Sequence, residues 1–224
     1  MKTMNKTVPH PLLLERPQTL GEEIANAISH GIGFLLALAS LPILAVVTVQ
    51  RGGVADVVGA SVFSATMIVL YLVSALYHAL PPGAAKRWFA RIDHAAIYVF
   101  IAGSYTPFVL GVLRGGWGWA LFGIVWALAA LGVAAKLLNR LRHPLASTAL
   151  YVAMGWVAVI AVVPLVQRVP AAGLAWLVGG GLAYTAGALV FLFDNRVRYA
   201  HFAWHLFVMA GSACHFFAVL GYAR

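Results

Sequence analysis

Two pairs of polar side chains in this 224-residue sequence are spaced by one helical turn. His201 and His205 are four residues apart, so both imidazoles would project from one helical face and share an ion. Ser74 and His78 have the same spacing. Three neutral imidazoles from two helices leave the fourth position of a tetrahedral zinc ion open, as in catalytic rather than structural sites. The spacing therefore predicts a Zn²⁺ site formed by His78, His201 and His205.

Asp93 is the carboxylate expected to work with such a site. A zinc ion lowers the pKa of its coordinated water towards about 7, which provides hydroxide at neutral pH. Asp93, or alternatively Glu23, would hold that water or accept its proton, and Ser74 would hydrogen-bond the water or a developing oxyanion. Phe202 follows His201 where the soluble His-Glu-x-x-His enzymes carry glutamate, so the base must come from another helix. Iron or manganese would also suit three histidines.

The composition indicates that these residues lie in a membrane protein. Hydrophobic residues make up 62% of the chain and charged residues 9%, against about 25% charged residues in a soluble domain. Seven apolar runs are long enough to cross about 30 Å of hydrocarbon as helices. The sequence therefore predicts an all-α integral membrane bundle of seven transmembrane helices. The runs are 29–49, 54–80, 93–113, 117–138, 146–166, 171–193 and 200–222.

The distribution of lysine and arginine predicts the orientation of this bundle. Eleven of the 15 basic residues fall in the N-terminal tail and in the loops after the second, fourth and sixth runs. This excess predicts a cytoplasmic N-terminus and an external C-terminus, in a plasma membrane. We expect residues 1–27 to form a polar cytoplasmic segment and residues 28–224 a single seven-helix transmembrane domain. Glu15, Glu22 and Glu23 argue against a cleaved signal peptide.

The predicted topology brings the candidate residues to one level, near the cytoplasmic ends of four helices. Each has an ordinary explanation by itself, since Ser74 could bond its own helix and Asp93 could cap one. Their convergence favours a site, because ionisable groups in a membrane are costly and usually functional. Four more residues at this level are candidates to orient the ligands by hydrogen bonds or to contact the membrane interface. They are Glu23, Asn26, His30 and His94.

Several other functions and partners are disfavoured. The net charge of +9 does not indicate nucleic-acid binding, because the basic residues lie in short gaps between apolar runs. The single cysteine, Cys214, allows no internal disulfide. Membrane lipids are the expected partners. No oligomeric state is predicted, since Gly179–Gly181 and Gly187 would allow close helix contacts within or between chains.

Blocks of sequence around these residues resemble the hemolysin III family, the bacterial branch of the progestin and adiponectin receptor superfamily, itself related to alkaline ceramidases. The resemblance runs from about Glu22 to the end of the chain. It implies seven helices with a cytoplasmic N-terminus, zinc on His78, His201 and His205, and a cavity for a lipid-like molecule. The blocks are Glu23-x-x-Asn26-x-x-x-His30, Ser74-Ala-Leu-Tyr-His78, Arg91-Ile-Asp93-His94, Gly103-Ser104-Tyr105-Thr106-Pro107 and His201-Phe-Ala-Trp-His205.

Three functions are consistent with this pattern. The first is a zinc-dependent hydrolase of an acyl-lipid amide or ester, involved in membrane-lipid or fluidity homeostasis. The second is a non-enzymatic lipid sensor or regulator in which zinc is structural. The third is a cytolytic, haemolytic pore, which the family name suggests. Intramembrane charge confined to one end of the bundle argues against a continuous polar conduit and makes the pore the last choice.

Overall fold

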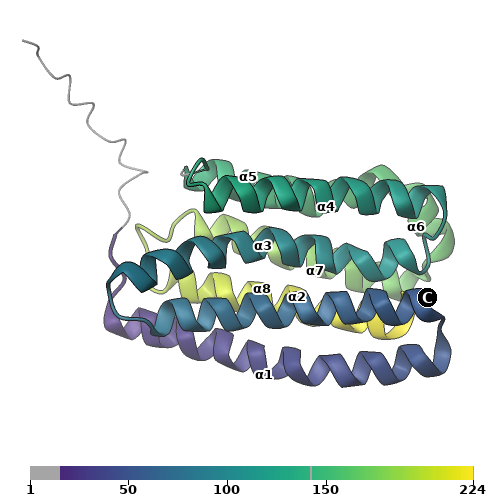
Figure 1. The fold of residues 1–224 in the computed structure, drawn as a ribbon, viewed down its shortest axis with the longest axis horizontal. Coiled ribbons are helices and arrows are strands. Elements are labelled where there is room, and N and C mark those ends of the chain that lie inside the picture. The colour runs from purple at the N-terminus through teal and green to yellow at the C-terminus, as the bar shows by residue number, and fades with distance from the viewer. Residues whose placement is uncertain (1–15, 142, 224) are drawn as a thin grey trace, which may run out of the picture.

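The computed structural model describes residues 16–141 and 143–223, and all regular structure in these ranges is helical. The helices lie alongside one another, and the C-terminal residues lie at the opposite end from the start of α1 (Figure 1). The elements are α1 (Leu20–Arg51), α2 (Val54–Ala79), α3 (Ala84–Leu110), α4 (Gly116–Leu137), α5 (Pro144–Gly155), the 3₁₀ helix η2 (Trp156–Ala161), α6 (Val162–Arg168), α7 (Ala171–Phe191) and α8 (Ala200–Tyr222). Because α5, η2 and α6 form one pass, the described chain traverses the bundle seven times.

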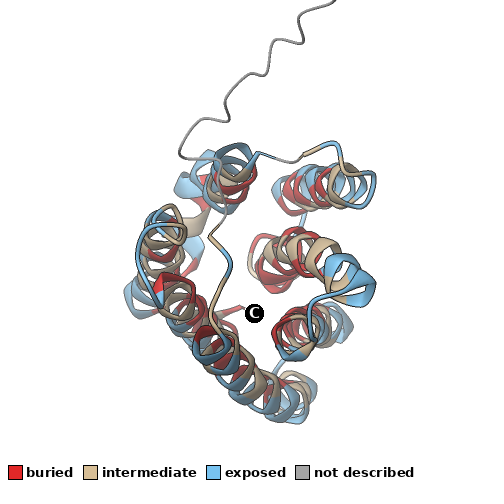
Figure 2. Ribbon diagram, turned by 90° about the vertical axis from the view of Figure 1, so that its left-hand side faces the viewer, coloured by how far each residue is buried: buried red, intermediate tan, exposed pale blue. Residues whose placement is uncertain are grey.

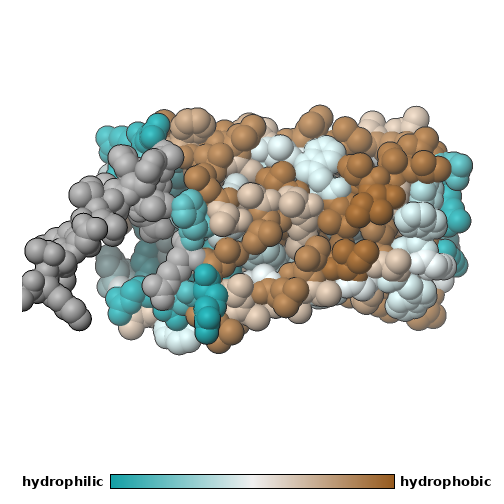
Figure 3. Space-filling model, turned by 90° about the horizontal axis from the view of Figure 1, so that it is seen from above, coloured by the Kyte–Doolittle hydropathy of each residue, from teal (hydrophilic) through white to brown (hydrophobic). Residues whose placement is uncertain are grey.

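Six of the passes in the described residues are long and apolar enough to cross a membrane. The remaining one, α3, packs between α2 and α4 and begins with the charged residues Lys86, Arg87, Arg91 and Asp93. The surface is mainly apolar along the middle of the bundle and hydrophilic at both ends (Figure 3). Many leucine and valine side chains are exposed on it, as expected where lipid rather than water is the solvent. The protein is therefore a multi-pass integral membrane protein.

The direction in which the bundle crosses the membrane stays a prediction. The two termini of the described chain lie at opposite ends, as an odd number of passes requires (Figure 1). Lys2, Lys6, Arg142 and Arg224, which entered the charge count, lie outside the described residues.

α1 begins earlier than the predicted span, at Leu20 rather than at residue 29. Thr19 caps it, because the Thr19 hydroxyl accepts a hydrogen bond from the Glu22 backbone N–H while the Glu22 carboxylate accepts one from the Thr19 N–H. The last residues of the predicted polar segment, 20–27, are thus helical. Residues 1–15 of that segment lie outside the described part of the chain.

α3 also begins earlier than predicted, at Ala84 instead of residue 93. The helix continues through the basic stretch that follows Gly83, so Asp93 lies in its interior. This position excludes the explanation that Asp93 merely caps a helix.

The predicted fifth span, 146–166, is interrupted. The Tyr105 hydroxyl reaches into it from α3, where it donates to the Gly155 carbonyl at 2.5 Å, lies 3.1 Å from the Met154 carbonyl oxygen, and accepts from the Ala158 N–H at 3.0 Å. A side chain inserted into the backbone ladder replaces regular helical bonds. Pro164 adds to the break, because it cannot donate to the carbonyl of Ile160. The result is the 3₁₀ segment between α5 and α6.

Glycines on α7 pack against α8 of the same chain. A Cβ atom on Gly180 would lie 2.4 Å from Nδ1 of His215, and one on Gly187 would lie 2.7 Å from Cβ of Phe207. The close contacts that these glycines permit are therefore intramolecular. Seen from the end where α1 begins, the helices are arranged in a ring (Figure 2). Arg16, Pro17 and Gln18, which precede α1, line the cavity inside the bundle.

Candidate metal centre

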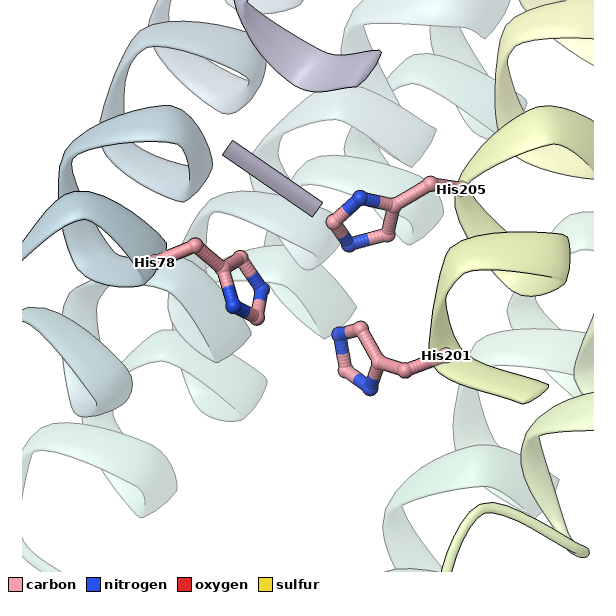
Figure 4. A group of neighbouring side chains, drawn as sticks. All are labelled: His78, His201 and His205. Carbon is pink, nitrogen blue, oxygen red and sulfur yellow. The ribbon is translucent and has the colours of Figure 1, made fainter. Parts of the chain in front are cut away.

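Three buried histidines meet near the end of the bundle where α1 begins. His78 extends from α2, and His201 and His205 extend from α8 toward it (Figure 4). Each offers one ring nitrogen, and these three atoms lie within 4.8 Å of one another. The rings are about equally spaced, with centroid separations of 4.9, 5.0 and 4.8 Å. The three residues lie close enough to hold one metal ion, as their spacing predicted.

Carboxylates orient two of the three rings. Nδ1 of His78 lies 2.8 Å from Oε2 of Glu23, and Nδ1 of His201 lies 3.0 Å from Oδ2 of Asp194. An ionised carboxylate only accepts hydrogen bonds, so each Nδ1 carries the proton and each Nε2 keeps a lone pair. Nε2 of His78 is buried and has no hydrogen-bond partner among the described residues. A metal ion would satisfy this nitrogen, so the residues fit the implied group.

The third ring is oriented by a serine. Ser29 donates its hydroxyl proton to the Asn26 carbonyl at 2.9 Å, and the same oxygen lies 3.1 Å from Nδ1 of His205. Since this hydroxyl has used its single proton, Nδ1 of His205 is the donor and Nε2 again keeps the lone pair. All three histidines are thus held in the tautomer whose Nε2 is free to bind a metal.

His30 contacts the cluster by stacking. Its ring lies against that of His205, with centroids 3.4 Å apart and planes 7° from parallel. Both of its ring nitrogens are buried without a hydrogen-bond partner in the described residues. His30 therefore supports the position of a candidate ligand through its ring face and not through the predicted hydrogen bond.

The other residues predicted to orient the ligands behave differently from one another. Glu23, besides holding His78, pairs with Lys86 at 2.9 Å, which leaves it less available as the alternative base. Asn26 acts through its backbone carbonyl, which accepts the Ser29 proton and also a hydrogen bond from His205. His94 lines the neighbouring cavity, but no hydrogen bond in the described residues joins its ring to the three histidines.

Two orienting residues, Ser29 and Asp194, were not predicted from the sequence. Asp194 lies in the polar segment between α7 and α8, seven residues before His201. A carboxylate just ahead of a helix with two candidate ligands was the available signal. Ser29 had no signal beyond its place next to His30, because its partner is 176 residues away in the chain.

Ser74 and Asp93 lie beside the cluster at a large cavity. Both are buried, and both line the same cavity as His201 and His205. The Asp93 carboxylate hydrogen-bonds the Ser74 hydroxyl. A carboxylate and a hydroxyl therefore stand next to the candidate metal ligands, where they could act on the same bound molecule.

The cavity has a volume of about 1150 Å³ and extends from the histidines along the bundle. At one end it is lined by Gln18 and Asp194, and at the other by Leu121 and Leu165. Its walls are mainly apolar, which is typical of sites that bury an acyl chain or another lipid-like molecule.

The sequence matches known proteins over nearly its whole length. A family model described as "Haemolysin-III related" matches residues 18–216. "Hemolysin-3" of Bacillus cereus is 42% identical over 205 residues, which cover 92% of this chain and 93% of the relative. A "Hemolysin-3 homolog" of Bacillus subtilis (strain 168) is 43% identical over 204 residues, 91% and 95% of the two chains. "Monocyte to macrophage differentiation factor" of Homo sapiens is 28% identical over 170 residues, 72% and 68%. No solved structure matches this chain.

Proposed function

This chain belongs to the haemolysin-III related family and is a bacterial multi-pass integral membrane protein, and from that premise we propose that it is a zinc-dependent hydrolase of an acyl-lipid amide or ester. One observation carries the proposal. Three histidines, each held through Nδ1, surround a common point beside Asp93 at the wall of a long apolar cavity.

The residues around this point have distinct roles in the proposed reaction. His78, His201 and His205 would hold zinc, which supplies the Lewis acidity that makes water a nucleophile near neutral pH. Asp93 accepts the proton of the attacking water and returns it to the leaving amine or alcohol. The Ser74 hydroxyl hydrogen-bonds the substrate carbonyl oxygen as negative charge develops there.

The cavity determines the kind of substrate. Apolar walls exclude water from the acyl chain and fix the carbonyl group next to Asp93. Cleavage would release the acyl chain from its headgroup and change the composition of the surrounding bilayer. We therefore place the reaction in membrane-lipid or fluidity homeostasis.

The first experiment is a measurement of metal content in protein purified in detergent without chelators. We expect about one zinc per wild-type chain, as in other three-histidine sites, and none in the His201→Ala/His205→Ala variant. Wild-type protein that folds but holds no stoichiometric metal would contradict the proposal.

The second experiment separates hydrolysis from metal binding. Asp93→Asn should retain zinc but lower the turnover of lipid amides or esters by about 10²- to 10⁴-fold, the usual contribution of a general base. Undiminished turnover in this purified variant would show that the proposed mechanism is wrong.

A non-enzymatic lipid sensor is the second candidate function. It is favoured by the way the cluster joins three helices, since the ligands on α2 and α8 are bonded to Glu23 and Ser29 on α1. A zinc ion would then fasten the bundle. This function predicts that chelation lowers the unfolding temperature markedly while no lipid is consumed.

A further inference from the structure

We propose that Tyr184 and His215 form a second binding site in the cavity, a mid-chain site that takes a hydroxyl group carried part-way along an acyl chain. The inference deepens the proposed function, on which it rests for the position of the carboxyl or amide end of the chain. It assigns the substrate to the class of hydroxylated acyl lipids.

The mid-chain site lies well away from the histidine cluster, on the wall of the same cavity. His215 follows His205 by ten residues on α8, which corresponds to about 15 Å along the helix axis. Tyr184 faces it from α7, and the two ring centroids are 5.3 Å apart. Polar groups at this depth in a membrane bundle are costly unless they bind something.

Tyr184 presents an acceptor to the cavity. Ser212 donates its only hydroxyl proton to the Val208 carbonyl at 2.9 Å and accepts one from the Tyr71 hydroxyl at 2.7 Å. The Tyr184 oxygen lies 3.1 Å from the same Ser212 oxygen. Because Ser212 has no second proton, Tyr184 must donate in this contact. The lone pairs of the Tyr184 oxygen are left to accept.

His215 presents a second acceptor. Its Nδ1 lies 3.0 Å from the Gly211 carbonyl oxygen, which can only accept, so Nδ1 carries the proton and Nε2 keeps a lone pair. The ring packs against α7 where Gly180 leaves space, since a Cβ there would lie 2.4 Å from Nδ1. The position of the acceptor is thus set by a backbone bond and by the absence of a side chain.

Two neighbouring acceptors on an otherwise apolar wall select a ligand that donates. The methylene groups of an ordinary acyl chain cannot donate to either acceptor, whereas a hydroxyl group between the two can share its single proton with both, so that each acceptor contributes to its binding. With C–C bonds of about 1.5 Å, an extended chain advances roughly 1.3 Å per carbon, so about 15 Å corresponds to roughly 12 carbons. The hydroxyl is therefore expected near the twelfth carbon of a chain whose polar end lies at the histidines.

The test is a binding measurement on the purified full-length protein. Octadecanoic acid and 12-hydroxyoctadecanoic acid would each displace radiolabelled octadecanoic acid in detergent. We expect the wild type to bind the hydroxy acid about tenfold more tightly, the advantage of one well-made hydrogen bond in a buried site. His215→Phe and Tyr184→Phe keep the ring volume but remove an acceptor, and each should abolish most of this preference without changing the affinity for octadecanoic acid.

A matched pair of glycine variants tests the geometry without removing a polar group. Gly180→Ala displaces the His215 ring and should reduce the preference for the hydroxy acid to about twofold or less, since a misplaced acceptor bonds poorly. Gly179→Ala is the control, because its added Cβ meets only Sγ of Cys214, at 3.9 Å. It should keep the full tenfold preference.

The outcomes distinguish this inference from the hydrolase proposal. The same comparison is made with acids that carry the hydroxyl at carbons from about 10 to 14. If the wild type binds each of these hydroxy acids no more tightly than octadecanoic acid, the mid-chain site is overturned, even if lipid hydrolysis is found. A preference that survives in both His215→Phe and Tyr184→Phe overturns it as well. A preference that depends on these residues supports it, even if zinc content and turnover fail their own tests.

Discussion

The helices that hold the histidines and the pass formed by α5, η2 and α6 differ in how closely they pack. A Cβ on Gly33 of α1 would lie 2.9 Å from the Tyr71 ring on α2, and one on Gly59 of α2 would lie 2.8 Å from Cα of Pro107 on α3. At Gly155, by contrast, an added Cβ meets nothing within 4 Å. The interrupted pass has only sparse contacts with α3, α4 and α7.

The two regions meet different requirements of one site. Three imidazoles can share an ion only if their helices keep fixed positions, which close packing and the bonds to Glu23, Asp194 and Ser29 provide. The proposed lipid substrate, in contrast, would have to enter the cavity. Exposed side chains on both sides of the boundary between η2–α6 and α7, such as Val159 and Val178, also line the cavity. At the loosely packed pass, residues that line the cavity are therefore also exposed on the outer surface of the bundle.

The largest expected effect concerns the bonds that fix the ligands. Asp194→Ala removes the acceptor for Nδ1 of His201 and should weaken zinc binding about 10- to 100-fold, as loss of such partners does in other metal sites. Competition with a zinc-binding dye would measure the change. Asp194→Asn is the matched control, since its amide oxygen can still accept the bond and should keep most of the affinity. An unchanged affinity in Asp194→Ala would mean that packing alone orients His201.

The next effect concerns the close packing itself. Gly59→Ala forces a Cβ into the backbone of α3 at Pro107 and should lower the free energy of unfolding by about 1–3 kcal/mol. The midpoint of thermal unfolding in a fixed detergent would report it. A variant as stable as the wild type would show that α2 and α3 can separate without loss, and the contrast between the two regions would disappear.

A smaller effect is expected where the two regions touch. Tyr105→Phe removes the hydroxyl that donates to the Gly155 carbonyl and accepts from the Ala158 N–H, and it should cost about 1 kcal/mol. Hydrogen exchange of the amides in residues 156–161 should become faster, while that of α8 stays as in the wild type. Faster exchange spread evenly over the bundle would argue against a locally weak pass.

The smallest expected effect is a gain in stability instead of a loss. Gly155 has φ −62° and ψ −30°, a helical conformation that alanine also prefers, and it has open space around it. Gly155→Ala should therefore stabilise the protein slightly, by about 0.4–1 kcal/mol, because it restricts the unfolded chain. The same thermal unfolding assay applies, and a loss of more than about 1 kcal/mol would show that this pass is tightly packed after all.

Much of the fold could be predicted from apolar runs alone. The prediction of 200–222 coincides with α8, that of 54–80 differs from α2 by one residue at its end, and that of 117–138 differs from α4 by one residue at each end. A helix that must cross hydrocarbon needs a minimum length of apolar residues, so composition by itself marks these elements. The predicted starts at residues 29 and 93 were late, because caps and charged turns extend α1 and α3 beyond the apolar runs.

Part of the candidate site could likewise be predicted from the sequence, and part of it could not. The i, i+4 spacing was sufficient to associate His201 with His205, since it places both on one helical face. That His78 joins them followed from the predicted topology. The oxygen atom that hydrogen-bonds each ring could not be predicted from the sequence, because Ser29 and His205, for example, are 176 residues apart and meet only when α1 packs against α8.

By itself, then, the sequence determined that the chain is a helical membrane bundle and which three histidines gather in it, because hydrophobicity and helical periodicity are local properties. Only the tertiary structure decided the orientation of each imidazole, the break in the fifth pass, the use of Gly180 and Gly187 within the chain, and the polar pair Tyr184 and His215 in the cavity wall. These features depend on side chains from different helices, and their distances are set when the helices pack.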